Sequence, residues 1–216
     1  MFENENTIGR GTINILEAAR LYCPKSKIFI SGSGLQFRND GEPIKETDDF
    51  EARDAYSVAR IHSVFAARYF RSFDLKIYVG YFFNHDSPRR SERHITKKIS
   101  EAAKRIANGS NEKIEIGDIS VVKEYTYAGD IVKAVWTLVN QDNIFEANLG
   151  SGKGYSIEDW LNACFGVAGR DWRQFVNIKD GFVAEYSQLV CDPTLIKSLG
   201  WEPEISFTDL AKMMMD

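Results

Sequence analysis

Helical and strand patterns alternate along almost the whole of this chain, and this alternation constrains its fold more than any other feature. Apolar residues recur at helical spacing over residues 8–22, 54–73 and 95–108. Short runs rich in β-branched and aromatic residues lie between these segments, over residues 27–31 and 75–83. Strands that alternate with helices in this way predict an α/β protein with a largely parallel sheet.

The alternation continues to the C-terminus, where residues suited to helix ends mark further helices. Strands are predicted over residues 112–118 and 145–150, and a helix over residues 129–141. Helices are predicted to begin at Ser156 and Ser206, and a third at Asp192, with Pro193 as its first helical residue. Predicted helix ends are Gly109 and Gly200.

Two polar segments interrupt the pattern. Residues 38–54 are dense in charged residues, glycine and proline, and residues 84–93 are polar and basic. Long loops inside a compact domain are usually functional. Binding residues are therefore expected in these two segments.

Composition narrows the class of protein further. With 27 basic and 31 acidic residues the net charge is −4, so no strong positive field favours nucleic acid or an anionic membrane surface. No apolar stretch approaches the ~20 residues of a membrane span, and the acidic start lacks the apolar region of a signal peptide. Three scattered cysteines and three histidines argue against a disulfide framework and a metal site. A reduced, cytoplasmic protein is expected.

Two glycine-containing segments lack the context of a nucleotide phosphate loop. Gly32-Ser33-Gly34 follows a predicted strand, but Phe37 occupies the place of the third glycine and no helical pattern begins there. Residues 149–156 lack the glycine spacing of a Walker loop. Neither segment is predicted to bind a phosphate.

Tyr56 and Arg60 are four residues apart on a predicted helix, so their side chains share one face. This helix follows a strand that ends in serines and precedes a strand that leads into a polar loop. The arrangement resembles the extended short-chain dehydrogenase/reductase superfamily, in which a strand-end Ser or Thr and a Tyr-x-x-x-Lys pair flank the sugar and the nicotinamide. Within it, residues 83–90 (FNHDSPRR) and 95–99 (ITKKI) resemble the signature of the GDP-mannose 4,6-dehydratase family. The resemblance extends from about residue 9 to the C-terminus.

The resemblance implies a partial Rossmann-like, doubly wound parallel sheet with a small C-terminal α/β substrate domain. Residues 1–93 would form the C-terminal part of the Rossmann-like domain, and residues 94–216 a mixed substrate-binding region that shares strands with it. The family's first βα units, with their glycine-rich pyrophosphate turn, have no counterpart in the sequence. Tight binding of NADP by this chain alone is therefore not expected, and the strand at residues 27–31 is expected to be an exposed sheet edge.

The resemblance also implies roles at the reacting sugar. Tyr56 stands where the family's tyrosine, as phenolate, takes the proton of the sugar 4-hydroxyl, and Ser33 stands at the hydroxyl-binding position. Arg60 replaces the lysine that favours the phenolate and holds the nicotinamide ribose, and its planar fork differs in shape from an ammonium. The dehydratase glutamate is replaced by Leu35, or by Gly34 if the register shifts by one. The carboxylate that loss of water requires is absent in either register.

Further positions are implied to bind the cofactor or the substrate. Candidate cofactor contacts are Arg60, His85 and Arg90, and candidate contacts with the nucleotide sugar are Asn84, Thr96, Lys97, Lys123 and Glu185. Phe182 replaces an arginine that helps to hold the nucleotide. The implied substrate pocket therefore keeps some of the family's residues and replaces others.

Three hypotheses remain open on the sequence. The first is a GDP-mannose 4,6-dehydratase-like protein that uses NADP and is impaired or inactive without a separate N-terminal cofactor half. The second is a nucleotide-sugar epimerase or ketoreductase of the same superfamily. The third is a catalytically inactive binding or scaffold subunit. The resemblance further implies a homo-oligomer formed through the Tyr56 helix, whose outer face is expected to carry Val64, Tyr69 and Phe70.

Overall fold

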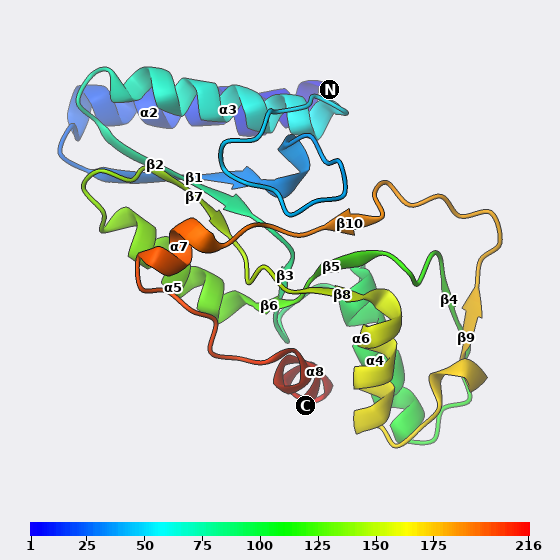
Figure 1. Cartoon of the computed structure of the whole chain (residues 1–216). Coiled ribbons are helices and arrows are strands. Elements are labelled where there is room, and N and C mark those ends of the chain that lie inside the picture. Colours follow the sequence, from blue (N-terminus) through cyan, green and yellow to red (C-terminus); the bar gives the residue numbers. More distant parts are fainter. The chain divides into compact units, whose positions relative to one another are not determined.

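The computed structural model describes residues 1–216 and divides them into two compact units, which are described separately here (Figure 1). Unit 1 comprises Met1–Phe83, Val132–Gly150 and Cys191–Glu202, and unit 2 comprises Asn84–Ile131, Ser151–Val190 and Pro203–Asp216. The boundary at residue 93 drawn from the sequence stays a prediction. None of the helices combines the length and the apolar character that a membrane crossing requires.

Unit 1 is built on a parallel sheet of three strands in the order β1-β2-β7. The strands are β1 (Lys27–Ser33), β2 (Lys76–Phe82) and β7 (Glu146–Leu149). Strand β2 lies in the centre and is buried along most of its length, as expected for an apolar strand of a parallel sheet. Strand β1 lies at the edge and pairs only with β2. The α/β class and the parallel sheet predicted from the alternating pattern are confirmed.

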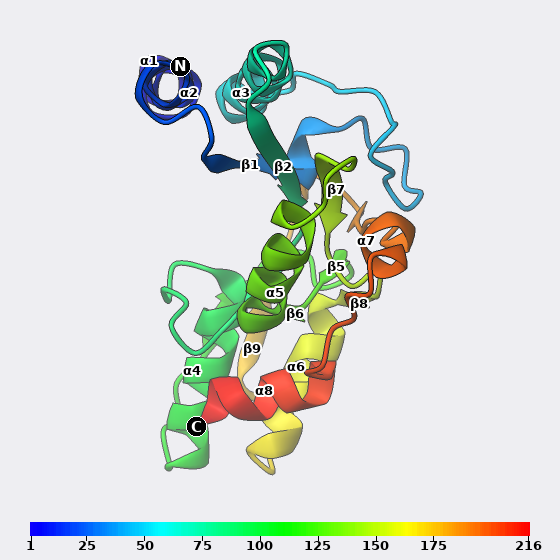
Figure 2. The same ribbon diagram turned by 90° about the vertical axis from the view of Figure 1, so that its left-hand side faces the viewer.

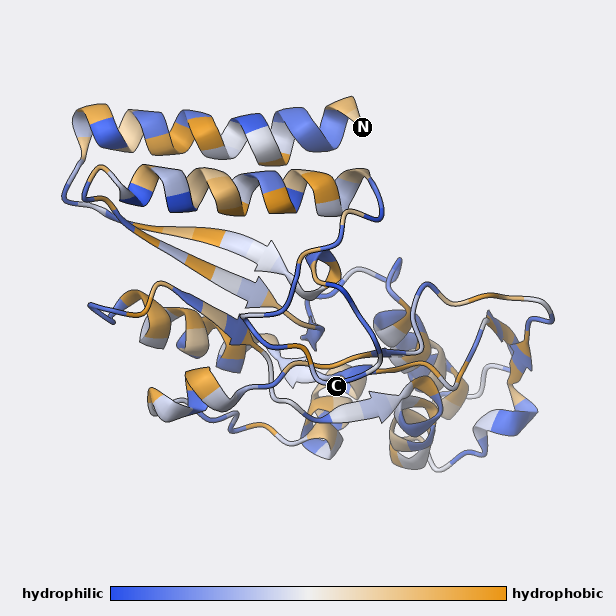
Figure 3. Cartoon of the chain, turned by 45° about the horizontal axis from the view of Figure 1, so that its top comes forward, coloured by the Kyte–Doolittle hydropathy of each residue, from blue (hydrophilic) through white to orange (hydrophobic).

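Helices cover both faces of this sheet. The helices α2 (Gly11–Tyr22) and α3 (Ala55–Arg71) lie on one side, and α5 (Ala128–Val139) and α7 (Thr194–Ser198) lie on the other (Figures 1 and 2). Apolar and polar residues alternate along α2 and α3 (Figure 3), which lets one face of each helix pack while the other stays in solvent.

Helix α3 begins where the sequence predicts. Asp54 is its N-cap, and its side chain accepts a hydrogen bond from the Ser57 backbone N–H at 2.7 Å. The outer face differs from the expectation, because Val64 and Phe70 are buried in the core of unit 1 and only Tyr69 is exposed. The prediction that Val64 and Phe70 face outward is therefore wrong. The register of the helix instead turns them toward the sheet.

The N-terminal helix begins earlier than the predicted residue 8. A short helix, α1 (Phe2–Asn4), and a π-helical segment over Glu5–Arg10 lead directly into α2. The Glu5 carboxylate lies 2.8 Å from Nδ1 of His62 on α3. This contact with a distant part of the chain attaches the extra turns to α3, and local periodicity does not reveal it.

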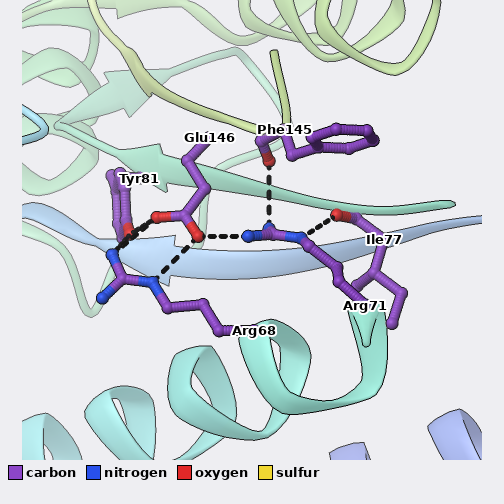
Figure 4. Close-up of polar contacts among 6 residues, drawn as sticks. All are labelled: Arg68, Arg71, Ile77, Tyr81, Phe145 and Glu146. Carbon is purple, nitrogen blue, oxygen red and sulfur yellow. Dashed lines mark hydrogen bonds and ion pairs between the residues drawn. The ribbon is translucent and has the colours of Figure 1, made fainter. Parts of the chain in front are cut away.

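A partly buried ionic cluster joins α3 to β7 (Figure 4). The Glu146 carboxylate accepts hydrogen bonds from Arg68 (2.7 Å), Arg71 (2.5 Å) and the Tyr81 hydroxyl (2.5 Å). Burial alone would raise the pKa of Glu146, but the hydrogen bonds from Arg68, Tyr81 and Arg71 lower it to about 2. This cluster fixes the helix that carries Tyr56 against the sheet.

The segment over residues 38–54 is a loop, as predicted, and it is attached firmly to unit 1. The Arg38 N–H donates to the Asp49 carbonyl at 2.8 Å, which closes the base of the loop. Ile44 is buried, and its carbonyl accepts a hydrogen bond from the side chain of Asn148 at 2.8 Å. The loop therefore forms part of the folded unit.

Unit 2 combines short strand pairs with three helices. Strand β5 (Val122–Glu124) lies between β10 (Gln188–Leu189) and β8 (Gly154–Ser156), β3 (His85–Asp86) pairs with β6 (Thr126–Tyr127), and β4 (Ile114–Ile116) pairs with β9 (Val176–Ile178). The helices are α4 (Ile95–Ala107), α6 (Ile157–Val167) and α8 (Phe207–Met215). Their apolar faces enclose one core, with Trp160, Phe165 and Ile99 fully buried.

The predicted helix starts at Ser156 and Ser206 are confirmed, because each hydroxyl accepts a hydrogen bond from a backbone N–H three residues later. Helix α7 starts one residue later than predicted. Asp192 accepts a hydrogen bond from the Thr194 N–H at 2.9 Å, but Pro193 occupies the N-cap position and is not the first helical residue.

Candidate functional site

The candidate site residues of unit 1 lie where β1 ends and α3 begins. Ser33 is the last residue of β1, and its hydroxyl accepts a hydrogen bond from the Leu35 N–H at 3.2 Å. The buried Gln36 side chain returns the contact by accepting from the Ser33 N–H at 2.9 Å. These two hydrogen bonds form a capping box, through which Gln36 fixes the turn. A polar side chain three residues after a serine is the sequence pattern that could have predicted it.

The two glycines of the Gly32-Ser33-Gly34 turn allow the backbone to pack closely against aromatic rings. A Cβ atom at Gly32 would lie 2.5 Å from the ring of Tyr81, and one at Gly34 would lie 2.8 Å from the ring of Phe83. A helix of only three residues, Gly34–Gln36, follows the turn. The turn therefore presents no long-helix N-terminus to a pyrophosphate, as the sequence predicts.

Arg60 is held at the end of β1. Its Nη1 donates to the Ser31 carbonyl at 2.6 Å and to the Ser31 hydroxyl at 2.7 Å. Its guanidinium carbon lies 5.1 Å from the centre of the Tyr56 ring, in a cation–π contact. The structure thus brings Tyr56 and Arg60 together, but the guanidinium lies over the ring and binds the strand end.

Leu35 is the residue that the resemblance places at the dehydratase glutamate, or Gly34 if the register shifts by one. Leu35 is half-buried in the turn that follows Ser33. An aliphatic side chain can neither remove the proton from C5 of a hexose nor protonate the leaving hydroxyl. Unit 1 therefore offers a candidate tyrosine and serine without the carboxylate.

The first candidate residues of unit 2 surround a buried carboxylate. Asp86 is 4% exposed, follows His85 in β3, and lies 3.5 Å from Nε of Arg90. Arg90 also donates to the His85 carbonyl at 3.1 Å and contacts Nδ1 of His94 at 3.0 Å. Burial raises the pKa of Asp86, and the Thr96 side chain and the nearby cations oppose that rise. Sequence reasoning missed Asp86, although it lies inside the FNHDSPRR motif.

Lys123 is the most unusual charged group of unit 2. Only 8% of its surface is exposed. Burial lowers its pKa to about 8; the Asp86 carboxylate opposes this change and Arg90 adds to it. Its Nζ lies 5.6 Å from the centre of the Tyr125 ring, whose hydroxyl is buried without a hydrogen-bond partner.

Lys123 lines a cavity of about 380 Å³ in unit 2. Glu185, a second candidate substrate contact, lines the same cavity. Apolar side chains form much of the rest of the wall: Ile95, Ile116, Val121, Ile157, Phe182 and Tyr186. Glu115, Asp118 and Lys179 also line it, so the cavity combines an apolar wall with charged groups of both signs. A cavity of mixed character like this can hold a small molecule.

The remaining candidate substrate contacts of unit 2, Asn84, Thr96 and Lys97, do not line this cavity. Lys97 forms an ion pair with Glu101 of its own helix at 2.5 Å. The Thr96 carbonyl accepts a hydrogen bond from the indole of Trp160 at 3.0 Å. The Asn84 carbonyl accepts from the Thr126 N–H at 3.4 Å. Of the predicted substrate contacts, Lys123 and Glu185 are the two that line the cavity.

Comparison with known proteins identifies the family to which this chain is similar. The family model described as GDP-mannose 4,6 dehydratase matches residues 3–214. The chain is 31% identical to GDP-mannose 4,6 dehydratase 2 of Arabidopsis thaliana over 98% of its own length and 59% of that protein. It is 29% identical to GDP-mannose 4,6-dehydratase of Vibrio cholerae over 95% of its own length and 64% of that protein. The chain therefore spans about three fifths of the length of the curated relatives it matches.

The fold is likewise similar to that of a solved structure. RMD from Pseudomonas aeruginosa complexed with NADPH superposes with a TM-score of 0.87 at 19% identity, covering 95% of this chain and 71% of that one. This likeness shows a Rossmann-like fold. Together with the family match over nearly all residues, it establishes that the chain belongs to the GDP-mannose 4,6 dehydratase family.

The residues present fit a nicotinamide dinucleotide poorly. The Nη1 of Arg60 is already bound to Ser31, and the Gly32–Gly34 turn is closed by the Ser33–Gln36 capping box. Arg90, a second candidate cofactor contact, binds the His85 carbonyl and His94.

Proposed function

We propose that this chain binds a nucleotide sugar of the GDP-mannose type in the cavity of unit 2, with the Lys123 ammonium on its diphosphate. The observation that carries the proposal is the position of Lys123, which is only 8% exposed and lines this cavity. Burial disfavours the charged form of a lysine, and an anionic group in the cavity would stabilise its ammonium. The names of the curated relatives point to the same class of ligand.

The size and lining of the cavity support a ligand of this kind. About 380 Å³ lies within the range of small-molecule sites, which is about 300–1,000 Å³. Glu185 supplies a carboxylate that can accept hydrogen bonds from hydroxyl groups of the ligand. Lys179 also lines the cavity, but it is exposed and pairs with Glu115 at 3.2 Å. Lys123 is therefore the cation assigned to the diphosphate.

In this proposal the chain alone does not dehydrate the sugar. Loss of water across C5 and C6 needs a proton acceptor and a proton donor, and Leu35 can provide neither. Tyr56, Ser33 and Arg60 remain candidate contacts with the sugar, and NADP is the cofactor expected only together with a separate N-terminal half. The first alternative is epimerase or ketoreductase chemistry, which needs no carboxylate at Leu35. The second is a binding or scaffold role, which applies if Tyr56, Ser33 and Arg60 are inactive.

The partners proposed are a cofactor-binding polypeptide and a second copy of this chain. The outer edge of β1 has no strand paired to it, which gives a separate N-terminal half a place to add a strand. Phe65, Tyr69 and Phe73 are exposed along and just after α3, at a spacing of four residues, and form an apolar stripe for self-association. We place the protein in the cytoplasm, in agreement with three cysteines that form no disulfide.

Equilibrium dialysis with GDP-mannose tests the binding proposal. Wild type is expected to bind saturably, Lys123→Met to lose at least tenfold in affinity, and Lys179→Met to bind within about twofold of wild type. Lys179 is the matched control because it lines the same cavity in an exposed ion pair. Equal binding by wild type and Lys123→Met would contradict the proposal.

A product assay tests the catalytic part. The chain is incubated with GDP-mannose and NADP, and the 4-keto, 6-deoxy product is measured. No such product is expected from the chain alone, and its formation would show that the missing carboxylate has been replaced. An assay across other nucleotide sugars separates dehydration from epimerisation and ketone reduction.

A further inference from the structure

The connection between β9 and β10 carries an exposed aromatic residue across unit 2. This connection spans residues 179–187 and can be followed in Figure 1 as the long segment between the two strands. Its first residue is fixed by a hydrogen bond from the Lys179 N–H to the Ile116 carbonyl at 2.8 Å. Its last residue is fixed by one from the Val122 N–H to the Ser187 carbonyl at 2.9 Å. Both ends of the connection are thus attached to strands that border the cavity.

Phe182 lies within this connection, and its ring packs on the backbone of Gly117. A Cβ atom at Gly117 would lie 2.6 Å from two carbons of that ring, so only glycine permits this approach. Phe182 is nevertheless 55% exposed, and it lines the same cavity as Lys123. The ring is therefore backed by Gly117 while much of its surface is open to a ligand.

We propose that Phe182 provides the surface on which the base of the bound nucleotide stacks. This proposal rests on the proposed function, since it takes the diphosphate on Lys123 as the fixed point of the ligand. A nucleobase has a flat π-face, and aromatic side chains are common stacking surfaces for bases. The apolar neighbours Ile95, Ile116 and Val121 suit a base better than a hexose rich in hydroxyl groups. The base and the phosphates are thus recognised by different residues of one cavity.

The two parts of the ligand can be separated with GDP and inorganic pyrophosphate as probes. Phe182→Ala is expected to weaken GDP binding about tenfold, as loss of one stacking contact does, and to leave pyrophosphate binding within about twofold. Phe182→Tyr keeps the ring and is expected to bind GDP like wild type. Gly117→Ala displaces the ring and is expected to weaken GDP binding as Phe182→Ala does.

The controls distinguish failure of this proposal from failure of the proposed function. Val183→Ala changes the neighbouring residue, which is 89% exposed and does not line the cavity, and is expected to bind GDP normally. If Lys123→Met weakens GDP binding but Phe182→Ala does not, the stacking proposal is wrong and the site stands. If Phe182→Ala weakens GDP and pyrophosphate equally, stacking on the base is also excluded. If wild type binds neither probe, the proposed function itself fails.

Discussion

Lys123 is a residue whose position favours binding over stability. A lysine with a pKa of about 8 in the folded chain and about 10.5 when unfolded destabilises the fold while it remains protonated. The family resemblance predicted a substrate contact here. The pKa of Lys123 could not be predicted, because it depends on burial in the fold and on the Asp86 carboxylate, which lies 37 positions earlier in the chain on another strand.

Replacing Lys123 by methionine is expected to stabilise the protein at pH 7. The shift in the pKa of Lys123 corresponds to about 3 kcal/mol, and part of it, roughly 1–2 kcal/mol, should be recovered as free energy of unfolding. Wild-type stability should rise between pH 8 and pH 10.5, because the unfolded chain then binds a proton that the folded chain has released. The gain from Lys123→Met should shrink over the same range.

Urea denaturation of both proteins across this pH range measures the effect. Lys179→Met is again the control and should leave the free energy of unfolding unchanged within about 0.5 kcal/mol, since Lys179 pairs with Glu115 at the surface. A Lys123→Met protein less stable than wild type at pH 7 would show that the ammonium has a structural partner.

At the scale of elements, the helices and strands that local residues define were predicted well. Helix α3 has its own cap at Asp54, and β2 is apolar along its length, so neither needs distant contacts to be recognised. The strands of two or three residues in unit 2, such as β3 and β10, are too short for periodicity and form only because a partner strand lies beside them. The contact between Glu146 and α3 is equally non-local.

Glu146→Gln tests how firmly α3 is attached to the sheet. The pKa of Glu146 is about 2 in the folded chain against 4.5 when unfolded, so its stabilisation is present above pH 4.5 and is lost as the pH falls toward 2. The substitution is expected to lower the free energy of unfolding at pH 7 by about 3 kcal/mol, because it also leaves Arg68 and Arg71 without their anion.

Denaturation between pH 2 and pH 7 provides the measurement. The difference between wild type and Glu146→Gln should narrow as the pH falls below 4.5. Asp142→Asn is the matched control, because Asp142 forms an exposed pair with Lys76 at 2.9 Å, and it should change stability by less than about 1 kcal/mol. A Glu146→Gln protein as stable as wild type at pH 7 would show that the cluster contributes nothing to folding.

At the scale of the whole molecule, family membership and fold class were accessible from the sequence, while the surfaces were not. The FNHDSPRR motif predicted the family, and the alternation of helical and strand patterns predicted the fold class. Which side of α3 faces solvent depends on how the helix is rotated against β2, and so Val64 and Phe70 were assigned to the wrong side.

The exposed stripe on α3 predicts self-association. Wild type is expected to sediment as a dimer or larger species, because Phe65, Tyr69 and Phe73 form an apolar patch that a second copy would cover. The double variant Phe65→Glu/Tyr69→Glu should sediment as a monomer with an unchanged circular dichroism spectrum. A monomeric wild type by light scattering would exclude this interface.

The cofactor is expected to bind weakly to the chain alone. A fluorescence titration with NADPH should show no saturable binding in the micromolar range, since the Gly32–Gly34 turn is closed and Arg60 is bound to Ser31. Saturable micromolar binding would show that the described residues can open to accept the dinucleotide.

The most direct test of the central claim is the pH dependence of GDP-mannose binding, measured by calorimetry from pH 7 to pH 10. The diphosphate of the ligand keeps its charge over this range, whereas Lys123 loses its proton near pH 8. The dissociation constant of wild type should be constant below pH 8 and rise up to tenfold per pH unit above it, while the weak binding of Lys123→Met should not depend on pH. Wild-type binding that is independent of pH, or Lys123→Met binding as tight as wild type, would contradict the assignment of Lys123 to the diphosphate.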